Sequence, residues 1–148
     1  MEETVKRNID KMYRVALAVT RDKTDAEDAV QDAFVKLFEK RPSFATPEHE
    51  TSWLIRVTVN ICKNLLKSQK KSTELLDIYP AQNDNQHELI QTIETLPEKY
   101  KLVIHLYYLE GYSTKEIAKI TKQKESTVRE QMTRARRTLK KYLQEEDL

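Results

Sequence analysis

The sequence predicts an all-α protein made of two small helical domains joined by a flexible acidic linker, the second domain being a helix-turn-helix. Three observations predict this fold class. The 148 residues include one Gly and four Pro, and because Gly supplies the positive φ of tight turns, few such turns are expected. Apolar residues recur at helical spacing along most of the chain. Leu, Ile, Val and Phe make up about a quarter of it, enough for two small cores rather than one large one.

Two helices are expected before residue 42. A first apolar stripe at spacings of three and four consists of Val5, Ile9, Met12, Tyr13, Ala16 and Leu17. Thr24 and Glu27 have the spacing of a capping box and predict the start of the second helix. Its apolar face would hold Ala26, Ala29, Val30, Ala33, Phe34, Leu37 and Phe38. The opposite face would carry Asp25, Asp28, Gln31, Asp32 and Lys36.

A connection bracketed by Pro42 and Pro47 should precede a long third helix that begins near Thr51 or Ser52. Its buried stripe would be Leu54, Val57, Thr58, Ile61 and Leu65. A second face would carry Trp53, Arg56, Asn60, Lys63 and Lys67. An aromatic ring can stack on a base, an amide can pair with a base edge, and cations can hold phosphates, so this face can read a nucleic acid. Taken alone, Trp53 fits a core position better.

The linker is predicted at residues 72–85, which are polar, contain Pro80 and lack helical periodicity. Domains are therefore expected at 1–71 and 86–148. After the linker, Leu89, Ile90 and Ile93 favour a short helix. Pro97 suits the first position of the next helix, whose inner face would hold Leu102, Val103, Leu106, Tyr107 and Leu109.

A helix-turn-helix pattern follows. Gly111 is placed to end a helix in left-handed geometry, and Ser113 with Glu116 forms a capping box for a helix of about two turns. Thr121-Lys122-Gln123 would form the turn before a longer helix, whose apolar side would be Val128, Met132, Ala135, Leu139, Tyr142 and Leu143. Because the second helix of such a motif enters the DNA major groove, DNA binding is expected. Helical hairpins that do not bind DNA share this pattern.

The net charge of +2 conceals an uneven distribution of charge. Residues 53–71 contain five bases and no acids, residues 72–98 contain six acids and no bases, and residues 112–143 contain ten bases and three acids. Two basic modules separated by an acidic stretch suit two contacts with a polyanion. Solvated helix faces are the alternative explanation of such charge runs.

Several classes of protein are not expected. The single Cys62 excludes an internal disulfide, the charged N-terminal segment lacks a signal peptide, and no apolar run approaches the roughly 20 residues of a membrane span. A cytoplasmic protein without membrane insertion is therefore predicted. His49, His87 and His105 lack metal-ligand spacing, and no Ser, His and Asp arrangement is detectable, so neither an enzyme nor a cofactor is expected.

The order of these features resembles the extracytoplasmic-function (ECF) sigma factors of bacterial RNA polymerase. Residues 12–38 are similar to the start of sigma region 2, and their segment DAEDAVQDAF resembles the clamp-binding helix. Residues 52–71 resemble the helix that melts the promoter and reads the −10 element. Residues 96–143 resemble region 4, with STVREQMTRARRTL at the position of the −35 recognition helix.

The resemblance implies a sigma factor that directs core polymerase to promoters, with the chemistry left to polymerase. The residues that would bind the β′ clamp helices of core polymerase are Asp25, Asp28, Gln31 and Asp32. Those that would hold the melted −10 strand are Phe44, Trp53, Arg56, Asn60, Lys63, Asn64 and Lys67. Those that would contact the −35 element are Ser113, Thr114, Lys115, Ser126, Thr127, Arg129, Glu130, Thr133, Arg134, Arg136 and Arg137. Region 4 would also contact the β-flap, the linker would follow the RNA-exit path, and an anti-sigma factor is expected as a further partner.

Two residues depart from the family pattern. Lys124 stands where a small hydroxyl residue usually caps the recognition helix, and Glu130 stands where a small residue is common. Phosphate repels an acid, yet Glu can accept from cytosine N4, so Glu130 could shift the −35 preference. Two alternative functions remain open at this point: a stand-alone helix-turn-helix transcriptional regulator that uses the C-terminal module alone, and a protein-binding adaptor.

Overall fold

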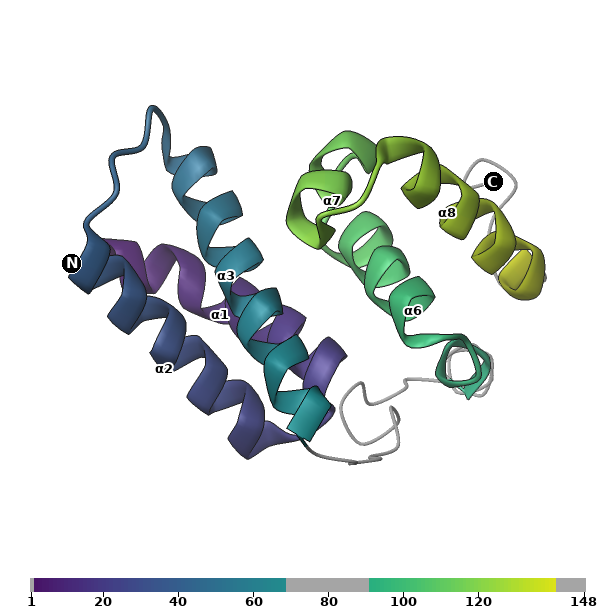
Figure 1. Ribbon diagram of the computed structural model, residues 1–148, viewed down its shortest axis with the longest axis horizontal. Coiled ribbons are helices and arrows are strands. Elements are labelled where there is room, and N and C mark those ends of the chain that lie inside the picture. Colours follow the sequence, from purple (N-terminus) through teal and green to yellow (C-terminus); the bar gives the residue numbers. More distant parts are fainter. Residues whose placement is uncertain (1, 69–90, 141–148) are drawn as a thin grey trace. The chain divides into compact units, whose positions relative to one another are not determined.

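The computed structural model describes residues 2–68 and 91–140, and within these ranges the regular secondary structure is entirely helical (Figure 1). This confirms the all-α prediction. The predicted linker at 72–85, together with Tyr142 and Leu143, lies outside the described residues. The chain divides into two compact units, Met1–Ser72 and Thr73–Leu148. None of the described helices is long and apolar enough to cross a membrane.

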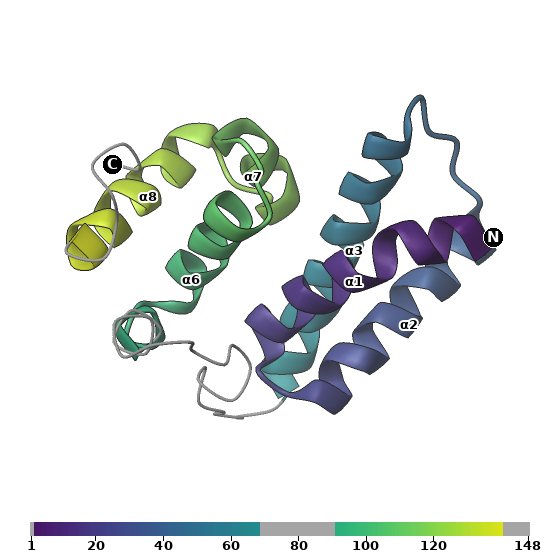
Figure 2. The same ribbon diagram turned by 180° about the vertical axis from the view of Figure 1, so that it is seen from behind.

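The first unit is a bundle of three helices, α1 (Glu2–Thr20), α2 (Lys23–Lys40) and α3 (Pro47–Ser68), each of which packs against the other two (Figure 2). Its core combines large side chains of α1 and α3 with a row of alanines on α2. The fully buried side chains include Met12, Val15, Ala26, Ala29, Ala33, Leu54, Ile55 and Val59. The small alanine side chains let neighbouring helices approach closely, which gives dense packing from few apolar residues.

The buried faces of α1 and α3 differ from those predicted. Ile9 is 39% exposed, whereas Asn8 is fully buried because α3 supplies its hydrogen-bond partner. On α3, Leu54 and Thr58 are buried as predicted, but Ile55, Val59 and Cys62 fill the core, and the predicted Val57, Ile61 and Leu65 are only half-buried. Contact with two neighbouring helices widens the buried face beyond one stripe.

The starts of α2 and α3 also differ from prediction. The Thr24–Glu27 capping box is wrong: Asp22 is the N-cap of α2, and its side chain accepts from the Asp25 N–H at 2.9 Å. Helix α3 begins at Pro47, about a turn earlier than expected. The Thr46 hydroxyl accepts from the His49 N–H at 3.2 Å, and Pro fits the first helical position because its missing N–H has no helical partner there.

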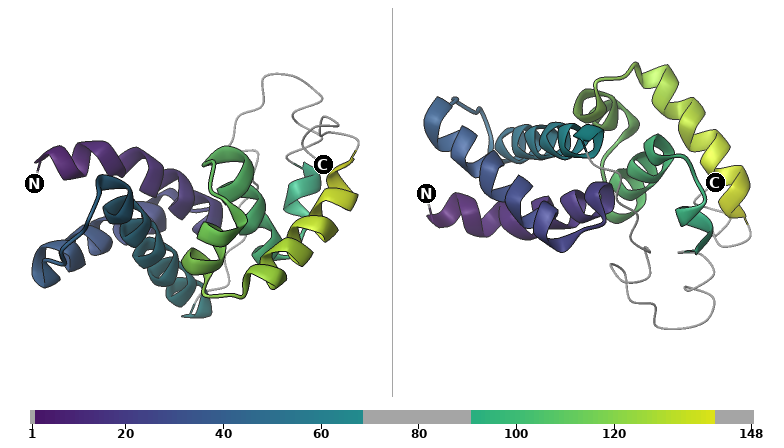
Figure 3. Two further views of the ribbon diagram at one scale, coloured as in Figure 1. Left: turned by 90° about the horizontal axis from the view of Figure 1, so that it is seen from above. Right: turned by 60° about the horizontal axis from the view of Figure 1, so that its bottom comes forward.

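The second unit contains α6 (Glu98–Ile104), the π-helical turn η1 (His105–Leu109), α7 (Thr114–Thr121) and α8 (Glu125–Leu139) (Figure 3). Helix α8 packs against both α6 and α7. Pro97 is the N-cap of α6 rather than its first helical residue. Leu102, Val103 and Leu106 are buried as predicted, but Leu109 is 61% exposed. The wider π turn contains an extra residue, which rotates Leu109 away from the core.

The helix-turn-helix is formed as predicted. Gly111 has a φ of +75° and leads into α7, where the Ser113 hydroxyl accepts from the Glu116 N–H at 3.1 Å and the Glu116 carboxylate accepts from the Ser113 N–H at 3.0 Å. Lys122 ends α7 with a φ of +57°. Lys124 is the N-cap of α8 and makes no side-chain capping bond there, in line with its departure from the family pattern.

We predict that Gly111→Ala lowers the free energy of unfolding by about 1–2 kcal/mol, because an alanine side chain disfavours left-handed backbone. No atom lies within 4 Å of a Cβ built on Gly111, so backbone strain is the sole expected cost. Gly111→Asn is the matched control, since Asn tolerates this region better. Urea unfolding of the full chain followed by circular dichroism measures both variants, and equal losses for Ala and Asn would contradict the prediction.

Candidate nucleic-acid interfaces

One side of α3 brings together the side chains expected to read the −10 strand. Trp53, Arg56 and Asn60 are half-exposed, and Lys63, Asn64 and Lys67 are exposed, at spacings that place them on one face. Phe44, from the loop before α3, packs against Trp53 with ring centroids 5.8 Å apart and planes tilted by 60°. Trp53 is thus half-exposed rather than part of the core. The arrangement combines an aromatic pair, amides and cations on one surface.

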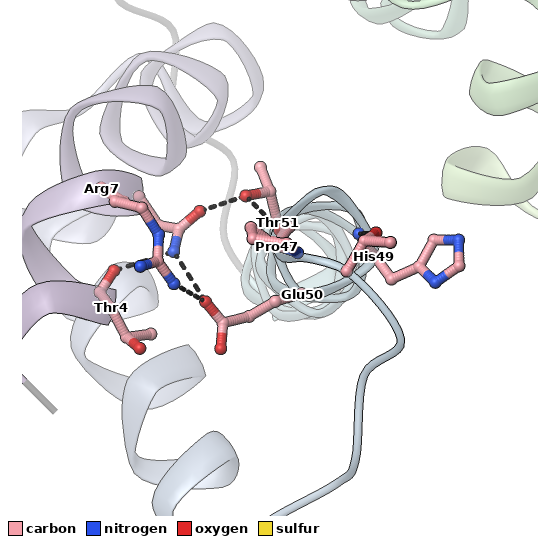
Figure 4. Close-up of polar contacts among 8 residues, drawn as sticks. Thr4, Arg7, Pro47, His49, Glu50 and Thr51 are labelled. Carbon is pink, nitrogen blue, oxygen red and sulfur yellow. Dashed lines mark hydrogen bonds and ion pairs between the residues drawn. The ribbon is translucent and has the colours of Figure 1, made fainter.

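A polar cluster anchors the first turn of α3 to α1 (Figure 4). The Glu50 carboxylate accepts from Arg7 Nη2 at 2.8 Å and from Asn8 Nδ2 at 3.4 Å. The same amide nitrogen donates to the Thr4 carbonyl at 2.8 Å, while the Thr51 hydroxyl donates to Asn8 Oδ1 at 2.5 Å. These bonds fix the helical turn that lies between Phe44 and Trp53.

The cluster was not among the predicted site residues. Its signal in the sequence is Asn8, which stands one turn before Met12 on the stripe that continues through Val15 and Val19. A polar residue on such a stripe is either a break in the core or a buried group with a partner. The partner came from α3, which the sequence pattern of α1 alone does not reveal.

The exposed face of α2 carries three of the four residues expected to bind core polymerase. Asp28, Gln31 and Asp32 are exposed. The expectation that Asp25 shares this face is wrong, since its residue is only 9% exposed. Asp25 lies at the start of α2, close enough to Cys62 to influence its titration: burial, and then the negative charge of Asp25, raise the pKa of that thiol to about 12.

The outward side of α8 presents most of the predicted −35 residues. The exposed ones are Ser126, Arg129, Glu130, Thr133, Arg134 and Arg137, and Thr127 is half-exposed. Two ion pairs run along the helix, one between Arg129 and Glu125 at 2.8 Å and one between Arg134 and Glu130 at 2.5 Å. The two arginines are therefore held along the helix by acids one turn before them.

Arg136 lies in a different environment from the other arginines of α8. Its Nε donates to the Tyr108 hydroxyl at 2.8 Å, and its guanidinium lies 5.4 Å from the centre of the Tyr107 ring. These contacts brace α8 against η1. Arg136 thus has a structural role that the sequence did not predict.

The start of α7 is tied to the start of α8. The Thr114 hydroxyl donates to the Glu125 carboxylate at 3.0 Å, and this bond, followed by that from Arg129, holds the pKa of Glu125 below its ordinary value. Gln131 Nε2, on α8, donates to Oε1 of Gln123 in the turn between the two helices at 2.7 Å. Lys115 is exposed in the first turn of α7, where the helix dipole favours an anion such as phosphate.

Comparison with known proteins identifies both units. Residues 4–72 match Sigma-70 region 2, and residues 86–139 match Sigma-70, region 4. The ECF RNA polymerase sigma-E factor of Escherichia coli K12 is 31% identical over 156 residues, which cover 89% of this chain and 82% of that protein. The chain belongs to the ECF RNA polymerase sigma factor family. The RNA polymerase sigma factor SigV of Bacillus subtilis is 29% identical, over 92% of this chain and 86% of that protein.

The fold of this sigma factor also matches solved structures. The sigma factor RpoE of Bartonella quintana, in its complex with the anti-sigma factor NepR, aligns with a TM-score of 0.77 and 21% identity over 95% of this chain and 94% of that one. The two family matches and the curated relatives show that the protein functions as an RNA polymerase sigma factor. The alternative of a stand-alone helix-turn-helix regulator is not favoured, because it does not explain why residues 4–72 match Sigma-70 region 2.

We predict that Asn8→Ala lowers the free energy of unfolding of this sigma factor by about 1–3 kcal/mol, because Asn8 is fully buried and its part-buried partners lose their hydrogen bonds. Asp10→Ala, at an exposed position on the same helix, is the matched control and should change stability by less than about 0.5 kcal/mol. Urea unfolding measures both variants. An Asn8→Ala loss no larger than that of the control would show that the cluster does not hold α3.

Proposed function

We propose that this sigma factor divides promoter recognition between its two units. The first unit binds core polymerase through α2 and the melted −10 strand through α3, and the second binds the −35 element through α8 and the start of α7. The observation that carries this proposal is the placement of the side chains. The aromatic, amide and cationic groups of the first unit share one face of α3, and most of the basic residues of α8 lie opposite its buried side.

The α3 face suits a single strand whose bases are unstacked. Extruding a base from the duplex costs a few kcal/mol, and stacking on an aromatic side chain returns about 1–3 kcal/mol per base. We assign that stacking to Phe44 and Trp53, and base recognition to Asn60. Phosphate contacts would come from Arg56, Lys63 and Lys67, with Asn64 as a further polar contact. The cluster around Glu50 supports this assignment because it fixes the helical turn that lies between the two aromatic residues.

The α8 surface suits duplex DNA. Its first turns would enter the major groove, with Ser126, Thr127, Arg129, Glu130, Thr133 and Arg134 near base edges or backbone. Arg137 would hold phosphate. At the start of α7, Ser113 is occupied by its cap and Thr114 by Glu125, so Lys115 and the helix dipole would supply the phosphate contact there.

The partners follow from the same division. We infer that Asp28, Gln31 and Asp32 bind the β′ clamp helices, that the second unit contacts the β-flap, and that polymerase carries out the chemistry without a cofactor from this chain. Residues 72–85 would follow the RNA-exit path. An anti-sigma factor is a further expected partner, since the structurally similar RpoE is described in complex with one. We infer a cytoplasmic location, because the proposed partners are core polymerase and promoter DNA.

We predict that two substitutions in the first unit separate its two roles. Asn60→Ala should lower promoter melting about tenfold or more while core binding stays unchanged, because a base contact is lost. Asp28→Lys should weaken core binding about tenfold or more, because the charge at the contact is reversed. Permanganate footprinting of the −10 region measures melting, and fluorescence anisotropy of labelled protein titrated with core polymerase measures binding.

Melting by the Asp28→Lys variant is measured at core concentrations that saturate its binding, where the wild-type level should return. Glu39→Lys, an exposed charge reversal near the end of α2, is the control for net charge. If Asn60→Ala abolished core binding, or if Asp28→Lys bound core normally, the division of roles within the first unit would be wrong.

A further inference from the structure

We propose that Glu130 determines specificity in the −35 contact and that it selects a cytosine. The inference rests on the proposed function, which places α8 in the major groove. Glu130 lies in the second turn of α8, a helix that begins at Glu125, and its side chain is 59% exposed. Residues in the first turns of a recognition helix are those that reach base edges.

The Glu130 side chain is held by Arg134, one turn later on α8, and Arg134 in turn contacts Tyr100. Arg134 Nη2 contacts Glu130 Oε1 at 2.5 Å, and Arg134 Nη1 contacts the Tyr100 hydroxyl at 3.4 Å. Tyr100 belongs to α6, so the chain of contacts joins the carboxylate of α8 to a second helix of the unit. Arg134 also offsets the negative charge of Glu130, which reduces its repulsion from DNA phosphates.

The hydrogen-bonding chemistry of an ionised carboxylate determines which base Glu130 would select. A carboxylate only accepts hydrogen bonds, and its two oxygens offer about four acceptor positions, so one contact with Arg134 leaves capacity for another donor. In the major groove, guanine and thymine present acceptors, which repel a carboxylate. Adenine presents a donor beside an acceptor, whereas cytosine presents its N4 amino group as a donor. Glu130 therefore favours cytosine over the other three bases.

The other acid of α8 provides a matched comparison. Glu125 Oε2 accepts from both the Thr114 hydroxyl at 3.0 Å and Arg129 Nη2 at 2.8 Å, and its side chain is 35% exposed. Its contacts join α7 to α8, whereas those of Glu130 run along the outward side of α8. The two glutamates have the same charge on the same helix, and of the two only Glu130 is assigned a contact with a base.

The test uses the full-length protein bound to core polymerase and a pool of promoter duplexes with a randomised −35 element. Bound duplexes are recovered and sequenced. Wild type should enrich cytosine at one position by about tenfold over the other bases. Glu130→Gln should shift that position toward adenine, because an amide can both donate to N7 and accept from N6. Glu130→Ala should lose the preference there alone, and Glu125→Gln should keep it.

Two results would overturn the inference. In one, Glu130→Gln keeps the wild-type base at every position. In the other, Glu130→Gln and Glu130→Ala relax all positions equally, which would assign Glu130 to the placement of the helix rather than to a base. In both, wild type still selects a −35 sequence, so the proposed function stands. If wild type enriches no −35 sequence, the proposed −35 function fails and this inference fails with it.

Discussion

Each of the two helices proposed to recognise DNA packs one side into a small core, and this constraint determines which side stays outside the core. On α8, Val128, Met132, Ala135 and Leu139 are at most 1% exposed. Because this stripe is fixed against α6 and α7, the arginines and Glu130 on the other side are held outward. The same holds for α3, where Leu54, Ile55 and Val59 are fully buried and the Trp53 face is not. Because the chain has few apolar residues, each core covers only part of its helix, and a wide face of the helix stays outside the core.

Polar contacts then set the positions of α3 and α8, each within its own unit. Thr114 and Glu125 join α7 to α8, and the side chains of Gln123 and Gln131 bond across the turn between them. In the first unit, Asn8 and Thr51 join α1 to the start of α3. Such bonds orient side chains before the ligand arrives, which reduces the entropy lost on binding. In each unit, the residues that stabilise the helix packing therefore lie close to the residues proposed to recognise DNA.

Sequence periodicity predicted the helices, the helix-turn-helix and the exposure of most candidate site residues, because these depend on local spacing. It failed where a partner came from elsewhere in the chain. The burial of Asn8 depends on α3, and the bracing of Arg136 depends on the two tyrosines of η1. Leu109 was misplaced because the sequence gives no sign of the π turn. Asp25 was predicted on the exposed face of α2, but it is buried because the start of α2 packs into the bundle.

Under the proposed function, two units of one chain read two promoter elements together. Linking two weak contacts gives selectivity through effective concentration, which is lost when the spacing between sites is wrong. The most direct test of this joint recognition is run-off transcription by core polymerase and this protein. The promoters compared differ only in the length between the −35 and −10 elements. We expect initiation that requires both elements and is strongest at one spacer length. Initiation that is independent of the spacer, or supported fully by one element, would contradict it.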